Sequence, residues 1–160
     1  MIKYPKDYNP LIEYWEWIQK NPKKVNKKIK IQVKSLVGDI TDITSDVYFN
    51  AEKSNHAIEF IESFCRNIKG KTAGKLVVLD LWQKAFIAAI FGIVYKKTDL
   101  RRTKRAVLII AKKNGKSLLA SAIGLYMLIA DSEGGPEGSS VARMVATLNR
   151  VKSVKAKFNI

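Results

Sequence analysis

The chain has 160 residues, a formal net charge of +15 at pH 7, and 47% apolar against 27% charged residues. This length suits one domain with a buried core, and the composition excludes a disordered chain. No apolar run reaches the roughly 18 residues that a membrane span requires, and the N-terminus lacks the apolar stretch of a secretory signal. The single cysteine, Cys65, allows no internal disulfide. We therefore expect a soluble protein of a reducing cytoplasm, with no membrane partner.

Capping signals and apolar periodicity predict three helices in the N-terminal part of the chain, over residues 9–20, 22–37 and 51–69. Asn9 and Asn50 are suitable caps for the first and third helix, and Gly38 is a natural end for the second. His56, in the third helix, has no second metal ligand or nucleophile near it in the sequence. We assign no chemistry to it.

One face of the expected helix 22–37 is rich in lysine: Lys23, Lys24, Lys27, Lys28, Lys30 and Lys34. Such a face can follow a phosphate backbone, so DNA contact through Lys23, Lys24, Lys27 and Lys28 is one interpretation. It contains no arginine and no interleaved aromatic residue, so nothing in it indicates readout of bases. The alternative, a solvated surface without a partner, stays open.

The second half of the chain predicts an α/β order. Residues 76–79 are a short strand or an extended lead-in, and residues 82–95 are apolar nearly all round, which is typical of a buried helix. Residues 106–111 form a continuous apolar run of the kind found in parallel strands. The elements expected after it are a helix over 116–130, a loop over 131–140, a strand over 141–147 and a helix over 148–159.

Gly-Lys-Ser at residues 115–117 lies at the junction of the predicted strand and helix. A phosphate loop reads G-x-x-x-x-G-K-[ST], and here Ile110 occupies the place of the first glycine. In such a loop Gly115 allows close backbone approach, Lys116 reaches the β- and γ-phosphates of ATP, and Ser117 holds Mg²⁺. A strand directly before and a helix directly after are what the motif demands. The sequence therefore predicts a phosphate loop.

The acidic motif that P-loop ATPases use to activate water is harder to find. An apolar strand ending in a carboxylate is expected after the phosphate loop, and the match at residues 76–80 comes before it. We interpret residues 76–80 as a lead-in to the following helix. The later acids Asp131, Glu133 and Glu137 all fall in a loop. The sequence thus provides a place for ATP without an evident means of hydrolysing it.

Two blocks, residues 79–92 and 111–121, resemble the large terminase subunit of tailed bacteriophages. The similarity extends over residues 47–65 and 124–135. It implies a P-loop ATPase that drives double-stranded DNA into a procapsid, followed in the full-length family by an endonuclease domain. It also implies a small terminase subunit and a portal protein as partners, an oligomer, and a site of action in the host bacterial cytoplasm.

The resemblance assigns roles to individual residues. Trp82 and Gln83 match the motif on the adenine side, with Gln83 reading the base edge, and the loop residues that would bind ATP are Lys113, Asn114, Gly115, Lys116 and Ser117. Ser117 would bind Mg²⁺. Lys112 stands where terminases often carry an arginine that acts on the γ-phosphate; lysine keeps the charge but loses the planar two-pronged donor. Residues 148–160 follow the family poorly.

The fold expected from these observations is a partial P-loop NTPase of the α/β class, with parallel strands and flanking helices. Residues 1–70 would form a helical N-terminal region and residues 71–160 the start of a truncated ATPase domain. Such a fragment would expose apolar faces and self-associate, and it is not expected to hydrolyse ATP alone. The alternative is a small basic DNA-binding or assembly protein that acts through the lysine-rich helix 22–37.

Overall fold

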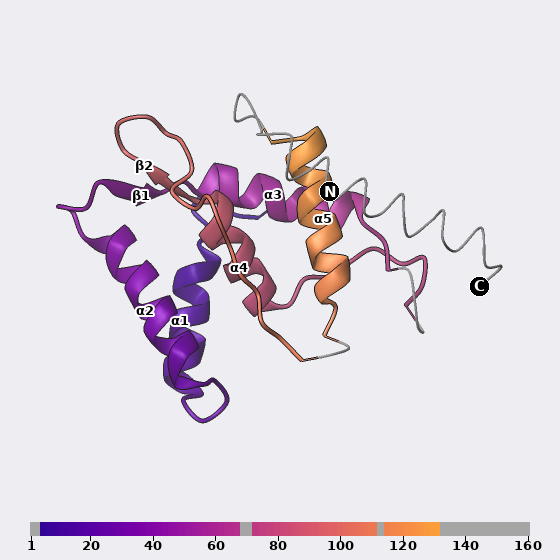
Figure 1. Ribbon diagram of the computed structural model, residues 1–160, viewed down its shortest axis with the longest axis horizontal. Helices are drawn as coiled ribbons and strands as arrows, with labels where there is room; N and C mark the ends of the chain where they lie inside the picture. Colours follow the sequence, from indigo (N-terminus) through magenta and orange to yellow (C-terminus); the bar gives the residue numbers. More distant parts are fainter. Residues whose placement is uncertain (1–3, 68–71, 112–113, 132–160) are drawn as a thin grey trace.

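The computed structural model describes residues 4–67, 72–111 and 114–131. Figure 1 shows mostly helices, with a small two-stranded sheet at one end. The elements in chain order are α1 (Pro10–Lys20), α2 (Lys27–Thr41), β1 (Val47–Phe49), α3 (Ala51–Phe64), α4 (Leu81–Phe91), β2 (Ile93–Tyr95) and α5 (Lys116–Ile129).

The predicted caps of α1 and α3 are confirmed. The Asn9 side chain accepts hydrogen bonds from the backbone N–H groups of Leu11 and Ile12, at 3.1 and 3.3 Å. Asn50 accepts from the N–H of Lys53 at 3.1 Å. Each bond satisfies a backbone donor that has no partner inside its helix. Sequence signals alone therefore located the start of both helices.

The predicted bounds of α2 are wrong at both ends. The helix begins at Lys27, with Asn26 as its cap, and it continues through Gly38 to Thr41. A glycine ends a helix when it adopts the left-handed conformation, but Gly38 is not among the residues with a positive φ. A Cβ at this position would meet no atom within 4 Å. Gly38 is therefore an ordinary helical residue.

The predicted helix 82–95 ends early, because its last residues form a strand. α4 stops at Phe91, and β2 pairs antiparallel with β1, with Val47 opposite Tyr95 and Phe49 opposite Ile93. β-Branched Ile93 and Val94 fit a strand better than a helix. Gly92 permits the close approach of the two segments, since a Cβ there would lie 2.5 Å from Phe49 Cε2.

The parallel sheet expected from the sequence is not present in the described residues. Their sheet is the antiparallel pair β1–β2, and residues 106–111 are assigned to no strand. Val107 is 82% exposed and Ile109 89% exposed. A strand forms only where the backbone N–H and C=O groups of a neighbouring strand pair with its own. No such pairing of residues 106–111 is found within the described residues. The strand and helix predicted at 141–147 and 148–159 lie outside the described residues.

The core lies around α4, which packs against α1 on one side and α3 on the other (Figure 1). Its buried side chains include Ile87, Ala88 and Phe91. α5 packs against α3 and adds Leu119, Ala122 and Tyr126 to the hydrophobic cluster that contains Ile87 and Phe91. α3 therefore contacts both α4 and α5. No helix within the described residues is long and apolar enough to cross a membrane.

Candidate functional site

The first turn of α5 presents several hydrogen-bond donors to solvent. Gly115, the residue before the helix, has φ +70°, a left-handed conformation that favours glycine. Among the described residues no side-chain cap is found at this end of the helix, and Asn114, Lys116 and Ser117 are exposed. Free backbone N–H groups, an ammonium group and a hydroxyl thus meet at one helix N-terminus, an arrangement suited to anions. Lys112 and Lys113 lie outside the described residues.

The first turn of α4 lies beside that of α5. A Cβ built on Gly115 would stand 3.7 Å from Nε2 of Gln83. The other end of the Gln83 amide is fixed, because its Oε1 accepts a hydrogen bond from the Asp80 N–H at 2.8 Å. Trp82 is half-buried and packs against the main hydrophobic cluster. The structure therefore brings Gln83 together with Gly115, two residues that are distant in sequence.

A buried carboxylate supports the segment that leads into α4. Glu62 of α3 is 2% exposed. Its Oε1 accepts from the Leu79 N–H at 2.9 Å, and its Oε2 accepts from the Tyr4 hydroxyl at 2.5 Å. Lys84 Nζ lies 3.8 Å from Oε1. A buried charge needs such partners, and here they hold residue 79 directly before the cap of α4.

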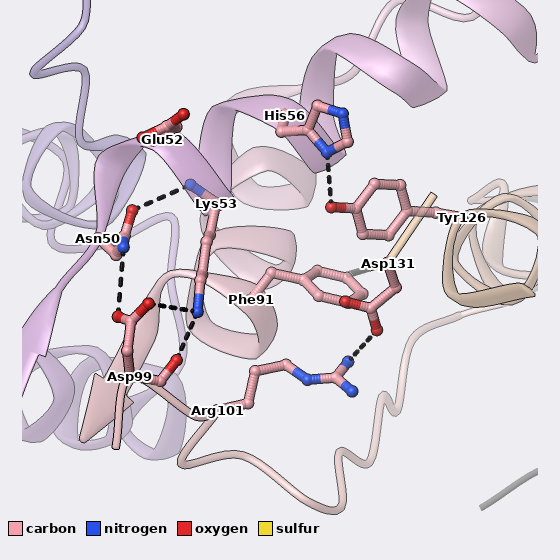
Figure 2. A pocket seen from close by; sticks show the side chains of 9 residues that line it. All are labelled: Asn50, Glu52, Lys53, His56, Phe91, Asp99, Arg101, Tyr126 and Asp131. Atoms are coloured by element: carbon pink, nitrogen blue, oxygen red, sulfur yellow. Dashed lines mark hydrogen bonds and ion pairs between the residues drawn. The ribbon is translucent and has the colours of Figure 1, made fainter. Parts of the chain in front are cut away.

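A separate polar pocket of about 380 Å³ lies at the opposite ends of α4 and α5 (Figure 2). It is lined by Asn50, Glu52, Lys53, His56, Phe91, Asp99, Arg101, Tyr126 and Asp131. The Lys53 ammonium lies 2.8 Å from an Asp99 carboxylate oxygen, and the Arg101 guanidinium lies 2.9 Å from Asp131. These ion pairs join the start of α3 and the end of α5 to the connector after β2. None of the residues predicted to bind ATP lines this pocket.

His56, to which the sequence assigned no chemistry, contacts α5 in this pocket. Its Nδ1 lies 2.9 Å from the Tyr126 hydroxyl (Figure 2). Burial, reinforced by the nearby Asp131 carboxylate, raises the pKa of Tyr126 to about 12. Within the described residues, no group of three or more His, Cys, Asp or Glu side chains is placed to hold a metal ion. The contacts at this pocket are those of a helix junction.

Four of the six lysines predicted on one helix face lie in α2, and Lys23 and Lys24 lie in the turn before it. Lys23, Lys24, Lys27, Lys28 and Lys34 are exposed and Lys30 is half-buried; we call these six residues the lysine surface. No acidic residue occurs between Glu16 and Asp39. α2 contacts α1 and β1, and Figure 1 shows α2 on the far side of α4 from α5.

Comparison with known proteins identifies the family. Residues 81–154 match the family described as "Terminase large subunit, ATPase domain". A curated relative, "Terminase, large subunit" of Enterobacteria phage HK97, is 32% identical over 108 residues, which cover 68% of this chain. The chain belongs to the terminase large-subunit family. The matched residues span 19% of the HK97 terminase, and no solved structure matches.

Two residues that support the candidate site were missed by the sequence analysis. Asp80 was interpreted as part of a lead-in, although Asp followed three residues later by Gln, at the start of an apolar run, is the signature of a capping box. The sequence therefore held a signal for the contact between Asp80 and Gln83. For Glu62 no local signal exists, because its partners Tyr4 and Leu79 are 58 and 17 residues away.

Proposed function

We propose that this chain carries the ATP-binding part of a phage DNA-packaging motor, at the first turn of α5. The observation that carries the proposal is the left-handed Gly115 before a helix whose first residues are Lys116 and Ser117, both exposed, in a chain of the terminase family. The packaging of DNA, the small-subunit and portal partners and the nuclease are expected of the whole protein. We place the start of its P-loop ATPase domain near residue 71.

Each loop residue has a role that its chemistry supports. The N–H groups at the start of α5 would surround the phosphates, and the Lys116 ammonium would neutralise the β- and γ-phosphates. Lys113 and Asn114 come directly before Gly115 and Lys116 in the loop. Mg²⁺ would enter with the nucleotide and neutralise phosphate charge, and the exposed Ser117 hydroxyl is the ligand that this loop offers.

Calorimetric titration of the chain with Mg-ATP tests this proposal. We expect saturable binding that is abolished by Lys116→Ala, because the ammonium is the main charge facing the phosphates. Lys97→Ala is a matched control, since Lys97 is exposed on the turn after β2. Binding that survives in Lys116→Ala, or absence of binding to the unaltered chain, would reject the loop as the nucleotide site.

Hydrolysis is expected to be absent from this length of chain. The sequence offers no acidic strand after the loop, and Lys112 replaces the arginine that terminases often carry there. Without a carboxylate to orient water, bound ATP should persist. Release of phosphate from Mg-ATP by the isolated chain, above the level of Lys116→Ala, would contradict this expectation and require a catalytic carboxylate among the residues present.

A second function, contact with double-stranded DNA, is favoured by the lysine surface. Six lysines lie there with no acidic residue in the same stretch of sequence, so their fields add without internal compensation. Ammonium groups bind phosphates by releasing counterions and do not require a specific base sequence. The duplex backbone is therefore the partner that this surface fits.

Salt dependence separates this second function from a solvated surface. Lys23, Lys24, Lys27 and Lys28, all changed to alanine, should weaken duplex binding and reduce the slope of log K against log salt by about 0.9 for each phosphate that the variant no longer neutralises. Lys6, Lys75, Lys97 and Lys104, also exposed, changed to alanine together provide a control with an equal reduction of charge. Equal slopes for the two fourfold variants would leave net charge as the sole cause of binding.

A further inference from the structure

Two successive backbone N–H groups connect the buried carboxylate of α3 with the side chain of Gln83. The Leu79 N–H donates to Glu62 Oε1 at 2.9 Å, and the Asp80 N–H donates to Gln83 Oε1 at 2.8 Å. Because each peptide unit is planar, only the two backbone dihedral angles of Leu79 separate these contacts. The placement of the Gln83 amide therefore depends on how Glu62 holds Leu79.

Glu62 is itself held by the segment before α1. The Tyr4 hydroxyl donates to Glu62 Oε2 at 2.5 Å, and the Tyr4 N–H donates to Glu59 Oε1 at 3.0 Å. The Asn55 side-chain amide donates to the Pro5 carbonyl oxygen at 3.1 Å, which adds a further contact between this segment and α3. Burial, together with the hydrogen bond to Glu62, raises the pKa of Tyr4. The phenol therefore keeps its proton and remains a donor to the carboxylate at neutral pH.

The residue after Gln83 contacts the same carboxylate and the same phenol. Lys84 Nζ lies 3.8 Å from Glu62 Oε1 and 4.9 Å from the centroid of the Tyr4 ring. An ammonium group over an aromatic face and beside a buried carboxylate is stabilised by both. Gln83 thus lies between two residues, Asp80 and Lys84, whose positions depend on the contacts of Glu62.

The chemistry of the Gln83 carboxamide suits one nucleotide base better than another. A carboxamide offers a donor and an acceptor side by side, and its oxygen has two lone pairs, so Oε1 can accept a second bond besides that from Asp80. Adenine presents a donor and an acceptor on its N6/N7 edge, whereas guanine presents two acceptors on its O6/N7 edge. A carboxamide held in one orientation therefore favours adenine over guanine.

We propose that Tyr4 and Glu62 are positioning residues for the nucleotide base. They hold Leu79, and through it Asp80, in the arrangement in which the Gln83 amide meets adenine. A side chain that is ordered before the ligand arrives loses less conformational entropy on binding. This inference rests on the proposed function. It makes a residue of the segment before α1 contribute to base selectivity without touching the nucleotide.

Calorimetric titrations with Mg-ATP, Mg-GTP and Mg-tripolyphosphate test this role in Tyr4→Phe. The variant loses one hydroxyl and keeps the ring that stacks on Tyr8 at 4.8 Å. The ratio of the ATP affinity to the GTP affinity should fall by roughly three- to tenfold, the usual cost of ordering one side chain on binding. Tripolyphosphate has no base, so its affinity should stay unchanged.

Tyr8→Phe is the matched control, because the Tyr8 hydroxyl donates to Glu13 of α1, at 2.6 Å. The variant loses the same group from the same stacked pair of rings, and its ratio of ATP to GTP affinity should equal that of the unaltered chain. A purely structural role would lower stability without changing this ratio. An unchanged ratio in Tyr4→Phe, or an equal fall in Tyr8→Phe, would overturn the proposal.

Two substitutions of Glu62 provide a conservative and a disruptive variant. Glu62→Gln keeps an oxygen that can accept from the Leu79 N–H and an NH₂ group that can donate to the Tyr4 hydroxyl, whereas Glu62→Met leaves both without a partner. Glu62→Gln should retain most of the preference for ATP, and Glu62→Met should lose at least as much of it as Tyr4→Phe. Equal ratios in the two variants would overturn the role of Glu62. Thermal unfolding followed by circular dichroism establishes that the helices are retained, and Tyr4→Phe decides the matter if Glu62→Met does not fold.

Failure of this inference can be told from failure of the proposed function. If the unaltered chain binds none of the three ligands, the phosphate loop itself is rejected and the positioning role falls with it. If all three bind and Lys116→Ala abolishes their binding, the loop stands whatever Tyr4→Phe shows. Equal affinities of the unaltered chain for Mg-ATP and Mg-GTP would then overturn the inference alone.

Discussion

The two helices α4 and α5 are similarly apolar in sequence but have different surroundings. α4 is enclosed by α1 and α3, and its side chains Ile87 and Phe91 are buried. α5 packs against α3, and its Leu128 and Ile129 are 54% and 66% exposed. Both helices are apolar nearly all round, which in sequence indicates full burial. The difference shows that burial depends on which neighbours are present, and not on the apolar character of the helix alone.

The largest expected effect is the difference in free energy of unfolding between equivalent substitutions in α4 and α5. Ile87→Ala removes a side chain that is 0% exposed, so it should lower the free energy of unfolding by about 3 kcal/mol through reduced burial and the cavity left behind. Ile129→Ala should change it by less than about 0.5 kcal/mol, because that side chain already contacts water. Chemical denaturation measures both. Similar losses for the two variants would mean that α5 is covered in solution.

A smaller effect is expected where α4 meets the sheet. Gly92→Ala would place a Cβ 2.5 Å from Phe49 Cε2 and 2.8 Å from the Ala88 carbonyl oxygen, and the required shifts should destabilise the protein by about 1–3 kcal/mol. Gly38→Ala is the control, since its Cβ meets nothing within 4 Å inside α2. It should stabilise the helix by about 0.5–1 kcal/mol. Stabilisation by both would contradict the pairing of β1 with β2.

Alkaline pH should destabilise the fold by ionising the buried Tyr126 of α5. The pKa of Tyr126 is raised from 10.0 to about 12 by burial and the Asp131 carboxylate, so the folded state favours the neutral phenol. The contribution of the neutral phenol to the free energy of unfolding is fully present below pH 10 and is lost as pH rises toward 12. Tyr126→Phe should therefore show a shallower loss over that interval in denaturant titrations. An unchanged slope would show that Tyr126 does not titrate with folding.

Substitutions of exposed apolar side chains should change self-association more than they change the free energy of unfolding. Val107 and Ile109 are 82% and 89% exposed, so the isolated chain is expected to self-associate. Val107→Lys with Ile109→Lys should reduce the sedimentation coefficient toward that of a monomer, while the free energy of unfolding changes by less than about 0.5 kcal/mol. An unaltered chain that is monomeric at all concentrations would contradict the expected self-association.

Local chemistry made some features of this chain predictable. Asn9 and Asn50 cap helices because their side chains satisfy nearby N–H groups, and such contacts depend on residues within a few positions. The start of α5 at Lys116 was likewise predicted from Gly-Lys-Ser and the apolar run after it. The strand β2 was missed because α3 and α4 separate it from its partner β1 along the chain, beyond the range of any local pattern.

The sequence by itself determined the caps of α1 and α3, the start of α5 and the family, because each depends on neighbouring residues or on a motif of fixed spacing. Tertiary structure decided which apolar segments are buried, that Ile93–Tyr95 pairs with Val47–Phe49, and that residues 106–111 stay unpaired among those described. It also placed the Gln83 donor beside Gly115. These outcomes require residues far apart in sequence to meet, and the free energy of such contacts belongs to the packed chain and not to any segment alone.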